Sequence, residues 1–177
     1  MSAAPASSSS QQFRPVDFDP FAPRGTPVVL PLTPAQQEVW MAAQMGADAS
    51  SAYNQSFPMR LVGPLSIESM RTAIAGLANR HEALRTTFSP AGESQIVAAA
   101  AALPLTLHDI SAVAEQHRRQ EIGQLLEREV REPFDLAKGP LARFHIVRES
   151  EHAHVLIMTA HHLVCDGWSS GCCVPEW

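Results

Sequence analysis

The sequence predicts a two-layer α/β lobe in which helices lie on one face of a mixed sheet. Helical and extended patterns alternate between residues 33 and 160, and two β-rich runs near the carboxyl end are joined by a short polar link. At 177 residues, with 45% hydrophobic and 18% charged side chains, the chain has the length and composition of one globular domain with its own core.

The first elements follow from capping and alternation. A helix is expected over residues 33–45, because Pro34 suits the first helical turn and Gln36 stands where it can complete a capping box with Thr33. Polar and apolar residues then alternate over 54–62, which predicts a half-buried strand.

The middle of the chain predicts a second helix and a hairpin. Ser66 is a good cap for a helix that ends near residue 80, and apolar residues share one face of it: Ile67, Met70, Ile74, Leu77 and Ala78. Residues 84–88 and 94–97 flank a turn that contains Pro90 and Gly92, so they are expected to pair. Residues 98–103 fit a strand or a loop.

The last elements are a long helix and an antiparallel pair. The helix is expected over 111–131, with Ile122, Leu125, Leu126 and Val130 inward and Glu127, Arg128 and Glu129 facing water. Pro133 ends it. The runs 141–147 and 154–160 predict two adjacent strands.

Composition divides the chain into three regions. Residues 1–31 are rich in Pro, Ser and Ala and predict a flexible leader or linker, 32–169 form the lobe, and 170–177 form an atypical tail.

The net charge of −5 offers no basic surface for nucleic acid. Without a signal peptide or membrane span, the chain is expected to be cytoplasmic, with its three cysteines as free thiols.

The segment from His161 to Gly167 is the candidate site. It places two imidazoles, a carboxylate and a glycine directly after an apolar strand. Histidine exchanges protons near neutral pH, Asp166 can orient the ring or its loop, and Gly167 allows close approach of a substrate. A polar turn with hydrogen-bonded histidines is the alternative interpretation.

Three signatures in order resemble those of the condensation domains of nonribosomal peptide synthetases. They are Leu32–Trp40, Arg80–Phe88 and His161–Ser169, and the stretches Phe134–Leu136 and Gly139–Phe144 add to the likeness. The resemblance covers roughly Leu30 to Ser169. It implies a lobe like that of chloramphenicol acetyltransferase, with the second, carboxyl-terminal lobe missing and the tail typical of a truncated or out-of-frame ending.

The resemblance also implies roles at the site. His162 would be catalytic, as general base or as a hydrogen-bonding group that positions the amine, and His161 would hold the loop. Asp166 would shape the site by pairing with a cation from the second lobe. Gly167 would admit substrate and lend its N–H to the oxyanion. No cofactor would bind directly, because both substrates would arrive on phosphopantetheine arms.

The implied reaction is amide formation between a donor acyl or peptidyl thioester and an acceptor aminoacyl thioester. The expected partners are carrier domains, neighbouring synthetase modules and the complementary lobe. An inactive half-domain that at most binds a carrier protein is the alternative, and an epimerisation domain, which shares the histidine motif, is a further one.

Other residue clusters have competing interpretations. Cys165 lies three residues after His162 and suggests a Cys–His nucleophile. A reaction whose donor is already an activated thioester does not need such a nucleophile. Zinc ligands could come from His152, His154, His161, His162, Cys165, Cys172 and Cys173, although paired ligand spacings do not occur. A structural network is expected for Arg80, His81, Glu82 and Arg85, and Trp40 is expected to anchor the core.

Overall fold

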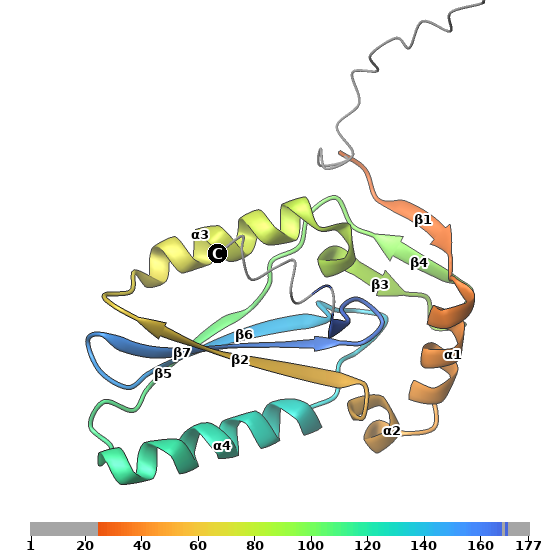
Figure 1. The fold of residues 1–177 in the computed structure, drawn as a ribbon. Coiled ribbons are helices and arrows are strands. Elements are labelled where there is room, and N and C mark those ends of the chain that lie inside the picture. Colours follow the sequence, from red (N-terminus) through yellow and green to blue (C-terminus); the bar gives the residue numbers. More distant parts are fainter. Residues whose placement is uncertain (1–24, 168, 170–177) are drawn as a thin grey trace, which may run out of the picture.

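The computed structural model describes residues 25–167 and 169 and contains two sheets (Figure 1). The strands are β1 (Val28–Pro31), β2 (Asn54–Val62), β3 (Thr86–Phe88), β4 (Ser94–Val97), β5 (Leu105–Asp109), β6 (Ala142–Arg148) and β7 (Ala153–His161). The helices are α1 (Pro34–Ala43), α2 (Ala47–Ser51), α3 (Ile67–Arg80), the 3₁₀ helix η1 (Glu82–Arg85) and α4 (Glu115–Arg131). Most of the expected leader and all of the expected tail 170–177 lie outside the described residues.

Strand β7 is the centre of the larger sheet, whose order is β2-β7-β6-β5. It pairs antiparallel with β2, from Asn54 opposite His161 to Val62 opposite Ala153, and antiparallel with β6 on its other side. Strand β5 runs parallel to β6, which makes the sheet mixed. The expected α/β lobe with a mixed sheet, including the β6–β7 pair, is therefore confirmed.

Helices cover both faces of this sheet, whereas one face was expected. Helix α3 packs on Phe144, Leu156 and Met158, and α4 packs on the opposite face, where Val155 and Ile157 are buried (Figure 1). The reason lies in β6 and β7, which are largely buried on both sides. A strand that is apolar on both faces needs two covering layers.

Helix α4 also presents a different face from the one expected. Leu125 points inward as predicted, but Val130 is 38% exposed while Glu129, expected in water, is only 8% exposed. Partners on β6, the largely buried Arg143 and the buried His145, make this burial of a carboxylate possible. The helix begins at Glu115 instead of near Ser111, because a separate turn precedes it, in which the N–H of Val113 donates to the carbonyl of Ile110 and that of Ser111 donates to the Asp109 side chain.

The smaller sheet has the order β1-β4-β3, and two features in and next to it differ from the sequence prediction. Strand β1 lies within the expected leader and pairs with β4, so the folded lobe starts before residue 32. Residues 82–85, half of which were expected in the hairpin, form η1 instead. The hairpin of β3 and β4 itself is confirmed, as are the strand β2 and the helix α3 with its Ser66 cap.

The start of α1 shows how local sequence sets structure. The N–H of Gln36 donates to the Thr33 hydroxyl, and the N–H of Thr33 donates to the Gln36 side chain, which is the predicted capping box. This fixes the direction of α1 and brings Trp40 over the hairpin turn, against Gly92. Across the described part of the chain, none of the helices combines the length and the apolar character that a membrane crossing requires.

Replacing Gly92 with alanine should destabilise the fold. Gly92 has a φ of +71°, and a Cβ there would overlap the Trp40 ring. We expect the free energy of unfolding in urea to fall by about 1–3 kcal/mol. Gly76→Ala is the matched control, since a Cβ at this position of α3 meets no atom and should add about 0.5–1 kcal/mol. A Gly92→Ala protein as stable as the parent would contradict the packing described.

Candidate active site

Two adjacent histidines leave the end of β7 in different environments. The N–H of His161 donates to the carbonyl of Leu141 (3.0 Å), and the N–H of His162 donates to that of Tyr53 (2.8 Å). These bonds tie the strand end to the preceding segment of β6 and to the start of β2. His161 is the last residue of β7 and is fully buried, whereas His162 is the first residue of the following turn and is half-buried.

The ring of His161 is held as a neutral imidazole. Its Nδ1 accepts a hydrogen bond from the N–H of Leu163 (3.2 Å), so the proton of the neutral ring is on Nε2. Phe134 lies perpendicular to it at 6.4 Å between ring centroids, and Tyr53 lies at 6.1 Å. Burial lowers the pKa of His161 to about 4, with a smaller contribution from His162 in the same direction and an opposing one from the Ser50 backbone.

His162 is held through one ring nitrogen. Its Nδ1 lies 3.1 Å from the carbonyl oxygen of Cys165. Because a carbonyl only accepts hydrogen bonds, Nδ1 carries the proton of the neutral ring and Nε2 keeps a lone pair. The turn therefore leaves His162 with a nitrogen able to accept a proton or a hydrogen bond.

The turn that carries His162 is anchored in the core. The N–H groups of Val164 and Cys165 donate to the carbonyl of His161, at 3.0 and 3.3 Å. The side chains of Leu163 and Val164 are buried in a cluster with Phe88, which lies in the smaller sheet. The position of the imidazole is thus set by both sheets.

Asp166 and Gly167 follow the turn and are both exposed. One carboxylate oxygen of Asp166 accepts from the N–H and the hydroxyl of Ser169, at 2.7 and 2.6 Å. A Cβ at Gly167 would meet no described atom within 4 Å, so packing within this lobe does not require a glycine there.

The geometry of the described residues supports neither a Cys165–His162 nucleophile nor a zinc site. Cys165 is only 3% exposed, its thiol donates to the Asp166 carbonyl at 3.7 Å, and the Nδ1 of His162 lies against its backbone carbonyl. His154 lies at the opposite end of β7 from His161, so strand geometry separates two of the proposed zinc ligands. Among residues 25–167 and 169, no group of three or more His, Cys, Asp or Glu side chains is arranged for a metal ion. Cys172 and Cys173 lie outside the described residues.

The second signature supports the fold at the junction of α3 and η1. The Arg85 side chain is almost fully buried, with Nε donating to the carbonyl of Ala78 (3.2 Å) and Nη1 to that of Ala98 (2.5 Å). Glu82 lies 3.6 Å from its guanidinium. Arg80 and His81 lie at the end of α3. Trp40 packs at the edge of the apolar cluster around Phe88 and also lines a hollow.

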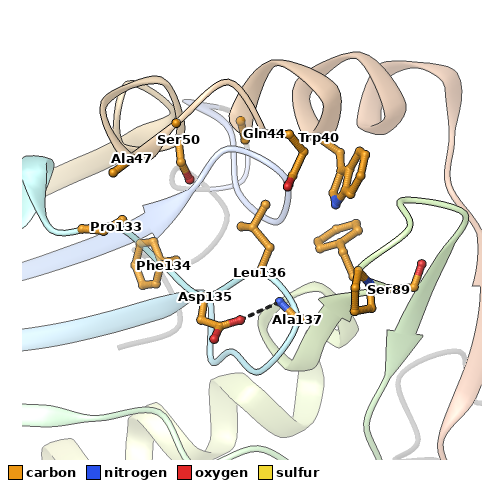
Figure 2. A pocket seen from close by; sticks show the side chains of 14 residues that line it. Trp40, Gln44, Ala47, Ser50, Ser89, Pro133, Phe134, Asp135, Leu136 and Ala137 are labelled. Carbon is orange, nitrogen blue, oxygen red and sulfur yellow. Dashed lines mark hydrogen bonds between the residues drawn. The ribbon is translucent and has the colours of Figure 1, made fainter.

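This hollow, of about 420 Å³, lies between the α1–α2 segment and residues 133–137 (Figure 2). Its wall includes Ser50 and Phe134, which also influence the ring of His161. His162 is not part of its lining. The hollow and the histidine turn therefore share a wall.

Sequence reasoning missed the side chains that enclose His161. Phe134 carries the guanidinium of Arg143 on its ring face, at 4.2 Å from the centroid. Arg143 in turn binds the carboxylate of Glu129. The available signal was the presence of Arg143 and His145 at alternate positions of an otherwise apolar strand, which indicates a polar contact on the α4 side.

The fold and the turn define an α/β lobe that presents a proton-accepting imidazole at the end of its central strand. The sequence matches the condensation domain family over residues 28–176. The chain belongs to that family, and the resemblance to condensation domains of nonribosomal peptide synthetases is confirmed.

Relatives and solved structures agree with this assignment. The chain is 40% identical to a chondramide synthase of Chondromyces crocatus over 84% of its own length and 4% of that protein's length. It is 36% identical to a malpibaldin synthetase of Mortierella alpina over 83% of its own length and 3% of that protein's. It shares its fold with the starter condensation domain of the rhizomide synthetase RzmA, at a TM-score of 0.74 and 23% identity over 84% of this chain and 36% of that one. The chain thus spans a small part of its curated relatives and about a third of the matched structure.

Proposed function

We propose that this lobe supplies the proton-accepting part of a site that forms amide bonds between carrier-bound thioesters. The observation that supports the proposal most directly is the hydrogen bond from His162 Nδ1 to the Cys165 carbonyl, because it leaves Nε2 as an acceptor. The half-buried position of His162 keeps this nitrogen within reach of a substrate.

The proposed reaction joins an acceptor amine to the carbonyl carbon of a donor thioester. The C–N bond forms, the C–S bond breaks, the amine gives up a proton and the departing thiolate takes one up. His162 Nε2 accepts the hydrogen bond, and then the proton, of the amine. The donor is already activated as a thioester, so no covalent intermediate on Cys165 is required.

The neighbouring residues have supporting roles in this proposal. His161, neutral and enclosed, holds the turn from inside the lobe. Asp166 shapes the loop through Ser169 and pairs with a cation of a complementary lobe. Gly167 admits the substrate and offers its N–H to the oxyanion, which agrees with the open space around it.

The proposed partners follow from the reaction. Donor and acceptor reach the site on phosphopantetheine arms of carrier domains, so the lobe itself binds no cofactor. The site also needs a carboxyl-terminal lobe to complete its walls, and the surrounding synthetase modules supply both carriers in the cytoplasm.

The test is a condensation domain assembled from this lobe and the carboxyl-terminal lobe of a related domain. Donor and acceptor aminoacyl carriers are mixed with it in a single turnover, and the dipeptidyl thioester is measured by mass spectrometry. We expect product from the assembled domain and little or none from the 177-residue chain alone. The control pairs the same carboxyl-terminal lobe with its own amino-terminal lobe. Product in the control but none with this lobe would refute the proposal.

A further inference from the structure

A chain of side-chain contacts leads from the end of α4 to His161. The guanidinium of Arg143 lies on the face of Phe134, and the ring of Phe134 stands perpendicular to that of His161. We propose that Arg143 and Phe134 are positioning residues that hold His161, and through it the tautomer of His162. This inference rests on the proposed function of His162 and adds two residues outside its turn.

The fixed end of this contact chain is Arg143. It binds the carboxylate of Glu129 through Nε, and its Nη2 donates to the carbonyls of Glu129 (2.6 Å) and Glu132 (2.8 Å). These carbonyls lie at the carboxyl end of α4, where backbone acceptors lack helical partners and where the helix dipole favours a cation. Both side chains of the ion pair are largely buried, at 15% and 10% exposure.

Two further groups keep the end of α4 in place. Asn54, opposite His161 in the β2–β7 register, donates to the carbonyls of Val130 (3.0 Å) and Glu132 (2.8 Å). His145 lies 3.1 Å from the second carboxylate oxygen of Glu129. The guanidinium therefore has little freedom to leave the ring of Phe134.

The free end of the contact chain is the histidine turn. Phe134 is buried and encloses one side of the His161 ring, whose Nδ1 fixes the N–H of Leu163. That bond sets the turn in which His162 Nδ1 reaches the Cys165 carbonyl. If Phe134 is removed, His161 gains space to rotate and the turn loosens, so both neutral tautomers of His162 become populated.

The test measures the ring nitrogens of His162 in the ¹⁵N-labelled 177-residue chain by NMR. In the parent protein we expect a protonated Nδ1 and an unprotonated Nε2. Phe134→Leu keeps an apolar side chain and the Arg143–Glu129 pair, and it should make the two nitrogen signals converge. Arg143→Lys keeps the charge but cannot bridge carboxylate, carbonyls and ring face together, so it should cause a smaller change of the same kind.

The matched control is Arg148→Lys, an arginine of the same strand whose ion pair with Asp109 is half-exposed. It should leave the His162 signals as in the parent. In the assembled domain, Phe134→Leu should lower kcat by roughly tenfold to a hundredfold with KM unchanged, as expected for a displaced catalytic group.

Parental His162 signals in either folded variant would overturn the proposal. Loss of folding in both variants would also overturn it, because the contacts would then serve stability in general. The NMR measurement does not require turnover. If the assembled domain with the parent lobe is inactive, that result counts against the proposed function, whereas the His162 signals still test the positioning role.

Discussion

Replacing His162 with alanine should lower kcat for amide formation by about 10²–10⁴-fold in the assembled condensation domain. The variant loses the only ring nitrogen that the turn leaves as an acceptor, while the backbone bond from His162 to Tyr53 remains. KM for the carrier-bound substrates should change little. Single-turnover rates and product masses measure both effects.

A second substitution separates the two roles expected for His162. His162→Gln keeps a side-chain oxygen that accepts a hydrogen bond, yet it cannot take up a proton at neutral pH. Activity as low as that of the alanine variant indicates a general base, whereas substantial recovery indicates positioning of the amine. His117→Ala, on the exposed surface of α4, is the control. Parental kcat in His162→Ala would refute the role of this residue.

Acidification from pH 7.5 to 5 should cost the chain about 2 kcal/mol of stability through His161 alone. The folded pKa of His161 is about 4, below its usual value of 6.5. Between pH 6.5 and 4, the His161 ring therefore binds a proton in the unfolded chain but not in the folded chain. Stability is fully present above pH 6.5 and falls as the pH drops towards 4. Burial also lowers the pKa values of His108, His145 and His154, so these side chains add to the loss of stability on acidification.

Urea unfolding of His161→Asn at several pH values isolates this contribution. Asparagine retains an acceptor for the N–H of Leu163 and does not titrate. The variant should be less stable at pH 7.5, since it loses the ring contacts with Tyr53 and Phe134. Between pH 7.5 and 5, however, it should lose about 2 kcal/mol less stability than the parent does. His117→Asn should retain the parental slope. An equal slope in His161→Asn and the parent would show that the folded protein tolerates the charged ring.

The elements that could be predicted from sequence are those whose causes are local. The capping box of Thr33 and Gln36 starts α1, the alternation of residues 54–62 matches β2, and Ser66 caps α3. The histidine turn was located for the same reason, since an apolar strand leads directly into it.

The features that sequence could not provide depend on contacts between distant segments. Strand β1 exists because it pairs with β4, which lies far along the chain beyond α3. Glu129 faces inward because Arg143 and His145 meet it from β6, against the pattern of its own helix. Periodicity reports how apolar a face is, and it does not report which polar groups find buried partners.

The long pairing of β7 with β2 fixes where the strand ends and the turn begins, and it thereby gives two adjacent histidines different environments. Nine residue pairs, from Asn54 opposite His161 to Val62 opposite Ala153, set the register, so His161 is the last residue of the strand and His162 is the first residue of the turn. A slip of the strand by one residue would move His161 from its place opposite Asn54 and away from the rings of Tyr53 and Phe134. The β2–β7 ladder therefore sets the difference between the two imidazoles: the sheet, rather than the chemistry of the ring, buries His161 and leaves His162 half-buried in the turn, where we propose that it meets the substrate.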